Sequence, residues 1–148
     1  MTREEATVLV NGALDQLVQH DLLLLDLKLC ERALHFKIAH YMAQSQIIRP
    51  PLTLDCEYNR HFRDEKRLRL FDNPRPSKVF PDILVHERNS DAHNIIALEI
   101  KRPGQSLSRD REKLQAFSTQ LGYSHTGHII IGHNRRGVLV REVRWVDG

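Results

Sequence analysis

The sequence predicts an α/β domain in which a central mixed sheet is flanked by helices on both sides. Two observations lead to this fold class. Apolar residues recur at helical spacing through the first third of the chain, whereas the remainder contains short apolar strands interrupted by one further helix. A chain of 148 residues suits one domain with one core. We expect residues 1–148 to form it, with residues 1–25 as an N-terminal helical extension of a core at residues 26–148.

Two helices are expected before the first strand. Residues 3–19 have apolar side chains at helical spacing, and Thr2 is placed to cap the N-terminus of this helix. Residues 20–25 are expected to interrupt the helix, and a second helix is expected over residues 26–45. A pair of prolines ends this second helix, because proline cannot continue the hydrogen-bond ladder.

Strands, turns and a third helix are expected in the rest of the chain. Residues 59–76 are polar, basic and dotted with proline, so we expect a loop or a ragged hairpin there. A helix is expected from Ser108 or Asp110 to Leu121, because apolar residues at helical spacing precede Gly122, a residue typical of helix ends. The strands are expected at residues 52–58, 79–86, 94–101, 128–132 and 138–145.

The composition argues against several classes of protein. No run of about 18 apolar residues is available to span a membrane, and acidic residues stand where a secretory signal has a basic start. The two cysteines, Cys30 and Cys56, are too few for a disulfide-stapled secreted fold, which favours a reduced, cytoplasmic compartment. The cysteines and histidines lack zinc-finger spacing, and we expect His125, His128 and His133 to be scattered over the surface.

Charged residues on two successive strands form the candidate site. Glu99 and Lys101 alternate with apolar residues in the strand 94–101, so both side chains are expected on one face of that strand. If the preceding strand lies alongside, Asp82 brings a second carboxylate to the same place. Two carboxylates repel each other unless a cation lies between them, and Mg²⁺ is a cation that proteins hold with one or two carboxylates.

The order of these residues carries a resemblance to a known family. With Pro81-Asp82 on one strand and Glu99-Ile100-Lys101 on the next apolar strand, the sequence resembles the PD-(D/E)XK nuclease superfamily over about residues 26–145. This resemblance implies a restriction endonuclease-like α/β sandwich around a central mixed sheet, preceded here by an extra N-terminal helix. It also implies hydrolysis of phosphodiester bonds with Mg²⁺, for which Mn²⁺ is the expected substitute.

The resemblance also implies a role for each site residue. Asp82 and Glu99 would bind the metal, and Lys101 would serve the attacking water. Many relatives place a glutamate on the first core helix, and Glu31 is the candidate here. The segment at residues 57–60, Glu-Tyr-Asn-Arg, is similar to one in small bacterial members of this superfamily.

Cations are concentrated in the segment before Asp82. The chain has 22 Lys plus Arg against 19 Asp plus Glu, and this formal net charge of +3 is too small to indicate nucleic-acid binding by itself. A basic loop that leads into a metal site is able to clamp the phosphates of a polyanion, although a solvated surface explains the same charges. The candidate nucleic-acid-binding residues are Arg60, Arg63, Lys66, Arg67 and Lys78.

These features favour Mg²⁺-dependent hydrolysis of phosphodiester bonds by a DNA endonuclease. DNA is the expected partner, no membrane is expected, and a homodimer is left open because cutting both strands of a duplex often needs two sites. One alternative is a non-catalytic nucleic-acid-binding protein that keeps the nuclease fold. Another is a protein-interaction module whose N-terminal helix docks on a partner. Tight, salt-sensitive binding without cleavage would favour the first alternative.

Overall fold

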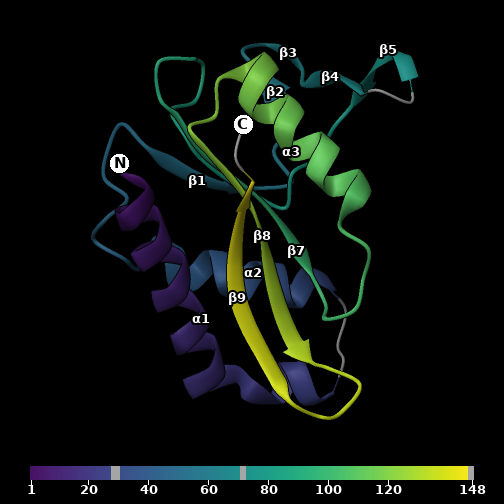
Figure 1. The fold of residues 1–148 in the computed structure, drawn as a ribbon. Coiled ribbons are helices and arrows are strands. Elements are labelled where there is room, and N and C mark those ends of the chain that lie inside the picture. Colours follow the sequence, from purple (N-terminus) through teal and green to yellow (C-terminus); the bar gives the residue numbers. More distant parts are fainter. Residues whose placement is uncertain (28–30, 71–72, 147–148) are drawn as a thin grey trace.

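The computed structural model describes residues 1–27, 31–70 and 73–146 of the chain. Within these residues three helices accompany a central sheet of five strands and two short hairpins (Figure 1). The helices are α1 (Arg3–Asp26), α2 (Glu31–Ala43) and α3 (Ser108–Leu121). The strands of the central sheet are β1 (Thr53–Cys56), β6 (Ile83–His86), β7 (Asn94–Lys101), β8 (His125–His133) and β9 (Leu139–Val146). The hairpins pair β2 (Arg60–His61) with β3 (Asp64–Glu65), and β4 (Arg67–Leu70) with β5 (Asn73–Lys78).

The central sheet is mixed, as the sequence predicts, and its strand order is β1-β6-β7-β8-β9. β7 and β8 are parallel, whereas each of the other neighbouring pairs is antiparallel. A parallel pair needs a long crossover connection, and α3 provides it between β7 and β8. β7 lies in the middle of the sheet, which explains why its sequence is apolar on both sides of the strand.

Helices cover both faces of the sheet, so this prediction is confirmed. Leu98 of β7 packs in a core with α1 and α2, whereas Ala97 packs on the opposite face with Phe117 of α3. Figure 1 shows α2 behind the sheet and α3 in front of it. Because side chains alternate along a strand, Glu99 and Lys101 belong to the α3 face. In the described part of the chain, no helix combines the length and apolar character needed to cross a membrane.

The first helix is longer than expected. α1 continues to Asp26, so the prediction that a second helix begins at residue 26 is wrong. The expected interruption is a kink at Asp21, whose backbone dihedral angles (φ −130°, ψ 28°) are not helical. Two residues of α2 hold this kink, because the Tyr41 hydroxyl donates a hydrogen bond to the Asp21 carboxylate and Lys37 pairs with it at 3.0 Å. Apolar side chains after the kink let the helix resume and reach the core.

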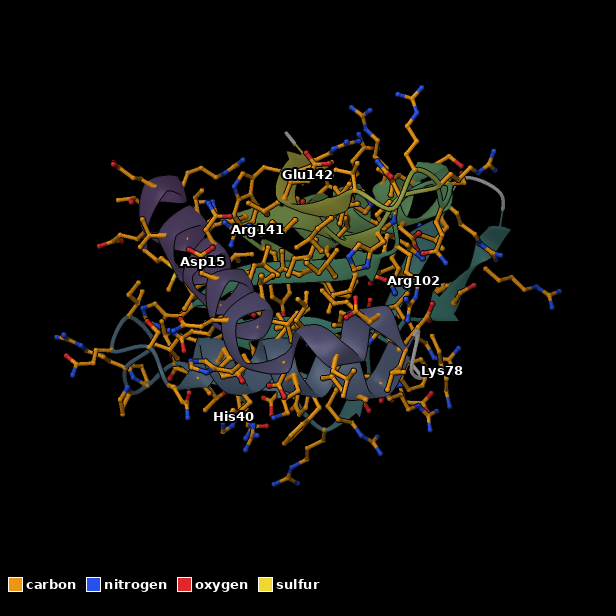
Figure 2. All side chains as sticks on the ribbon, turned by 90° about the horizontal axis from the view of Figure 1, so that it is seen from below. Asp15, His40, Lys78, Arg102, Arg141 and Glu142 are labelled. Atoms are coloured by element: carbon orange, nitrogen blue, oxygen red, sulfur yellow. The ribbon has the colours of Figure 1, made fainter. Side chains whose placement is uncertain are left out.

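The N-terminal helix is part of the main core rather than a separate layer. At its start, the Thr2 hydroxyl accepts a hydrogen bond from the Glu5 N–H, and the Glu5 carboxylate accepts one from the Thr2 N–H. This capping box confirms the predicted N-cap. Along the helix, Asp15 forms an ion pair with Arg141 of β9, and the two side chains meet at the surface in Figure 2. The residues at 1–25 therefore pack against the sheet that carries the candidate site.

Residues 59–82 form the hairpins and the approach to β6. The expected ragged hairpin is present as β4 and β5, whose register shifts between Leu68 and Leu70. The Val79 N–H donates a hydrogen bond to the Lys66 carbonyl at 3.2 Å, which keeps the chain on the hairpin beyond residue 78. For this reason β6 begins at Ile83 and not at residue 79 as predicted. The residues between these elements bring Asp82 to the position just before β6, at one end of the strands of the central sheet.

We predict that Gly127→Ala destabilises the protein by about 1–3 kcal/mol, because the added methyl group overlaps its surroundings. A Cβ atom at residue 127 would lie 2.8 Å from the Trp145 side chain and 2.9 Å from the Arg144 carbonyl. Gly12→Ala in α1 is the control, since a Cβ atom there meets nothing within 4 Å. It is expected to stabilise the helix by up to about 1 kcal/mol. Urea unfolding of both variants checks this, and equal stabilities would contradict the packing described here.

Candidate functional site

The pairing of β6 with β7 brings the two predicted metal-binding carboxylates together. Ile83 pairs with Leu98 in this antiparallel ladder. Asp82, the residue before Ile83, therefore lies beside Glu99, the residue after Leu98. A hydrogen bond also ties Asp82 to β7, because the Ile100 N–H donates to Asp82 Oδ2 at 2.7 Å. The side chain of Asp82 therefore lies across the end of β7, as the sequence predicts for a strand placed alongside.

Glu99 is a buried acid with a lysine partner. The residue is 4% exposed, and its Oε1 lies 2.6 Å from the ammonium of Lys113 on α3. The same ammonium donates a hydrogen bond to the carbonyl of Phe80 at 2.7 Å, which links α3 to the segment before Asp82. Burial raises the pKa of Glu99 to about 7; Lys113 opposes this rise and the nearby Asp82 adds to it. The two carboxylates are thus close enough to repel each other.

Lys101 lies beyond Glu99 on the same face of β7. Its ammonium pairs with Asp110 of α3 at 2.8 Å. Burial lowers the pKa of Lys101, but Asp110 and the acids at 82 and 99 outweigh that effect and raise it above its usual value. Lys101 is therefore a cation that can donate hydrogen bonds, and it lies near enough to Asp82 and Glu99 for both acids to raise its pKa.

Asp82 faces α2 as well as β7. Burial raises the pKa of Asp82, and the hydrogen bond from the Ile100 N–H opposes this rise. Its Oδ1 lies 3.6 Å from Nδ1 of His35, which is longer than a hydrogen bond. His35 is buried and its Nδ1 has no hydrogen-bond partner. A polar nitrogen without a partner, next to a carboxylate, indicates a position where a small rearrangement or a bound group completes the contact.

Glu31 is exposed at the start of α2, whereas His35 on the same helix approaches the site. Glu31 is the first residue of α2, and His35 is one turn further along the helix. Residues four apart share a helix face, so Glu31 and His35 lie on the same side of α2, but only His35 approaches Asp82. The structure places the buried imidazole, not the glutamate, near Asp82.

Two residues of α3 belong to the site although the sequence did not assign them a role. Asp110 and Lys113 are three apart on the helix, and they pair with Lys101 and Glu99 respectively. The inner stripe of the helix includes Phe117, which is four residues after Lys113. Charged residues on the inner stripe of an amphipathic helix are a signal that could have identified both side chains.

The neighbouring strand β8 places a buried histidine beside Glu99. His128 of β8 pairs with Glu99 in the parallel ladder. It is 2% exposed and its Nε2 has no hydrogen-bond partner, and burial lowers its pKa. The expectation that His128 lies on the surface is therefore wrong. The physical reason is the position of its strand, because β8 lies between β7 and β9 and α3 packs against it.

The carboxylates fit a cation that uses few protein ligands. Among residues 1–27, 31–70 and 73–146, no group of three or more His, Cys, Asp or Glu side chains is arranged to hold a metal ion. Asp82 and Glu99 would supply two oxygen ligands, and a cation between them would relieve the repulsion by which Asp82 raises the pKa of Glu99. Mg²⁺ is commonly held by one or two carboxylates together with water and substrate phosphates. These residues therefore suit Mg²⁺ or Mn²⁺ better than a metal that needs a complete protein cage.

The predicted nucleic-acid-binding residues fall into two groups. Arg60 and Arg63 are exposed on and beside the β2–β3 hairpin. Arg67 and Lys78 are neighbours on the β4–β5 hairpin, and both form ion pairs with Glu65. The carboxylate of Glu65 thereby neutralises part of the charge that the sequence assigns to a phosphate clamp.

Lys66 has a different environment from the other cations of this segment. It is 2% exposed, and its ammonium lies 4.9 Å from the ring centre of Tyr58 and 5.6 Å from that of Tyr123. Burial lowers the pKa of Lys66 to about 8. The rings replace water around the ammonium through cation–π contacts. Because a nucleic acid cannot reach this ammonium, we leave Lys66 out of the proposed interface.

A groove borders the site on the α3 side. This α3 groove has a volume of about 610 Å³ and includes Asp110 and Lys113, the partners of the two motif residues. The cations Lys78 and Arg109 also line it. A bound polyanion could therefore approach the acid pair along a basic wall. The other lining residues are Leu70, Ser77, Val79 and Phe80.

Comparison with known proteins adds no further constraint on this site. No family model, curated protein or solved structure matches the chain.

We predict that Lys113→Met raises the pKa of Glu99 above about 7, because the substitution removes the cation that favours the charged carboxylate. Carboxyl carbon shifts of labelled glutamate, followed by NMR against pH, measure this. Lys37→Met is the control, since it removes a cation that pairs with Asp21 in the α1 kink. A Glu99 midpoint that is the same in both variants would contradict the assigned ion pair.

Proposed function

We propose that this protein is a metal-dependent nuclease of the PD-(D/E)XK type that hydrolyses phosphodiester bonds in DNA. The observation that carries the proposal is the placement of Asp82, Glu99 and Lys101 at one end of two paired strands. The order of helices and strands also agrees with the α/β sandwich that the sequence resemblance implies. A restriction endonuclease-like fold is thus part of the proposal.

The carboxylates and the lysine have separate roles in this account. Asp82 and Glu99 hold the divalent cation, which when bound polarises a phosphate oxygen and makes a water more acidic. Lys101 donates hydrogen bonds from its ammonium, orients the attacking water and offsets the negative charge that develops on the phosphate. Asp110 positions the Lys101 side chain through its ion pair. Glu99 and Lys101 are two residues apart on β7, so this strand fixes the distance between the metal-binding carboxylate and the lysine.

Lys113 is the ion-pair partner of Glu99 when no cation is bound. Its ammonium neutralises Glu99 and is tied to the Phe80 carbonyl, so the buried acid has a partner in the free protein. A cation that binds the Glu99 carboxylate competes with this ammonium. We therefore assign Lys113 the role of a positioning residue that holds the Glu99 carboxylate near α3.

The α3 groove offers a path for the DNA backbone. Lys78 and Arg109 provide cations on its wall, and both are close in sequence to residues that contact the site. Contacts of this kind attach phosphates without reading bases, because they reach no base edge. We propose no sequence specificity, and we expect affinity to fall as salt concentration rises.

One observation favours a second candidate, a nucleic-acid-binding protein without catalysis. Glu99 and Lys101 each have an ion-pair partner on α3, which offsets both charges without a metal. A fold that has lost catalysis could keep such pairs for stability. Binding that needs no metal, together with no cleavage, would select this candidate.

We predict that Asp82→Asn, Glu99→Gln and Lys101→Met each reduce Mg²⁺-dependent plasmid cleavage by about 100-fold or more. Each change removes a ligand or the hydrogen-bond donor at the reacting phosphate. Asp15→Asn is the control, because Asp15 pairs with Arg141 at the edge of α1. Thermal melting shows that the variants are folded. Cleavage by Lys101→Met at the rate of the unchanged protein would overturn the proposal, as would absence of cleavage with both Mg²⁺ and Mn²⁺.

The pKa of Glu99 predicts how cleavage depends on pH. A raised pKa means that the carboxylate gains a proton as the pH falls through about 7, and the protonated form cannot hold a cation. The Mg²⁺ concentration for half-maximal cleavage is therefore expected to rise about tenfold for each pH unit below 7. Cleavage rates over a grid of pH and Mg²⁺ concentrations measure this. A half-maximal concentration that stays constant as the pH falls would contradict the role of Glu99.

A further inference from the structure

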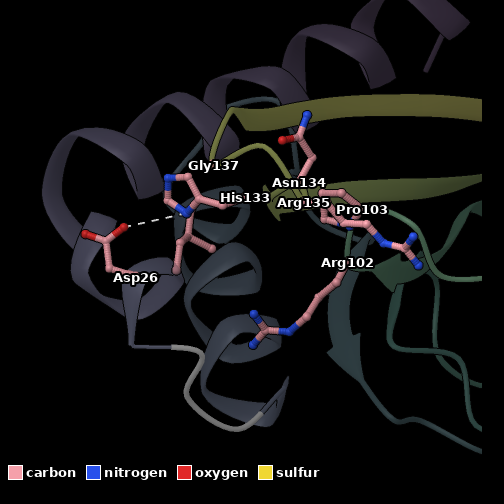
Figure 3. A pocket seen from close by; sticks show the side chains of 8 residues that line it. Asp26, Arg102, Pro103, His133, Asn134, Arg135 and Gly137 are labelled. Carbon is pink, nitrogen blue, oxygen red and sulfur yellow. Dashed lines mark ion pairs between the residues drawn. The ribbon is translucent and has the colours of Figure 1, made fainter.

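A second pocket lies beyond the carboxyl end of β7, on the side of the sheet that α1 covers. It has a volume of about 650 Å³ and lies where the end of α1 meets the segments that follow β7 and β8. Figure 3 shows Asp26 and His133 on one side of it, with Arg102 along the base and Asn134, Pro103 and Arg135 on the other side. We refer to this cavity as the basic pocket.

The basic pocket adjoins the candidate site through β7. Arg102 follows Lys101 directly in the chain, so the two Cα atoms are about 3.8 Å apart. β7 and β8 are parallel, and their carboxyl ends therefore lie at the same edge of the sheet. Ligands of open α/β sheets bind beyond such carboxyl ends. The basic pocket lies on the α1 side of this edge, where a strand bound at Asp82 and Glu99 would pass around the carboxyl end of β7.

The residues of the basic pocket suit a phosphate group. Two guanidinium groups, from Arg102 and Arg135, contribute forked donors that match phosphate oxygens. His133 adds an imidazole, whose Nδ1 lies 3.6 Å from Asp26. Asp26 is the one acidic side chain among the described residues that line the pocket. Removing its charge should therefore make the pocket more attractive to an anion.

The rim of the basic pocket is held in shape by a turn. Asn134 Oδ1 accepts hydrogen bonds from the backbone N–H groups of Arg136 and Val138, at 2.9 and 3.0 Å. Gly137 completes the turn with a φ of +73°, a conformation that suits glycine. The turn fixes where Arg135 leaves the backbone, so this cation is presented from an ordered rim.

We propose that the basic pocket binds one nucleotide of the substrate strand next to the cleaved bond, with its phosphate on Arg102 and His133. This inference rests on the proposed nuclease function. The volume suits it, because pockets of about 300–1,000 Å³ bury ligands of this size. The phosphate belongs either to the continuous backbone or to a strand end, and these two sources share the same chemistry.

The test is binding of a fluorescent single-stranded oligonucleotide in EDTA, where no cleavage takes place. Arg102→Gln is expected to weaken binding by about tenfold, because a charge-assisted contact is lost. The slope of log affinity against log salt concentration should fall by about 0.7, the value for one phosphate contact on a single strand. Asp26→Asn is expected to tighten binding, a change in the opposite direction. This second variant keeps the proposal testable if Arg102→Gln fails to fold.

Arg136→Gln is the matched control, because Arg136 is in the same turn and does not line the basic pocket. The proposal is overturned if Arg102→Gln weakens binding no more than this control does, or if Asp26→Asn fails to tighten it. Oligonucleotides with and without a 5′ phosphate separate the two sources. An effect that needs the 5′ phosphate assigns the pocket to a strand end, and an effect on both assigns it to the backbone.

The outcome is also separable from that of the proposed function. Binding changes of the expected signs in a protein that shows no cleavage with Mg²⁺ or Mn²⁺ would support the pocket and reject the nuclease. Cleavage that depends on Lys101, combined with unchanged binding in Arg102→Gln, would support the nuclease and reject the pocket. Both measurements use the full chain.

Discussion

The antiparallel pairing of β6 with β7 determines where each charge of the candidate site lies. This register sets Asp82 beside Glu99, and the hydrogen bond from the Ile100 N–H fixes the Asp82 carboxylate across the strand end. A shift of one residue would turn Glu99 and Lys101 toward the core of α1 and α2. The apolar residues that alternate with them in β7 oppose that shift, because they would then lose their contacts.

Burial makes this arrangement costly unless the charges have partners. Glu99 and Lys101 each find one on α3, and Asp82 finds a backbone N–H and a histidine nearby. The helix that covers the sheet is therefore also the source of the counter-charges. Such a network favours one defined geometry of the acids, and a divalent cation could enter by replacing the Lys113 ammonium rather than by rebuilding the strands.

The sequence predicts the strand and helix that carry the site residues, but it does not predict which side chains pair with them. The alternation of residues 94–101 defines β7, and residues 108–121 define α3, because periodicity reports which side chains share a face. It does not report which helix covers a strand end. Lys113 as the partner of Glu99, and the burial of His128 and Lys66, depend on such long-range packing. For the same reason, exposed Glu31 and buried His35 were distinguishable only in three dimensions.

A divalent cation held between Asp82 and Glu99 is the central claim. Crystals soaked in Mn²⁺, measured for anomalous scattering at the manganese edge, test it most directly. We expect one anomalous peak within bonding distance of both carboxylates, with the Lys113 ammonium moved away from Glu99. An absence of anomalous density at these residues, with the ion pair between Lys113 and Glu99 intact, would contradict the account.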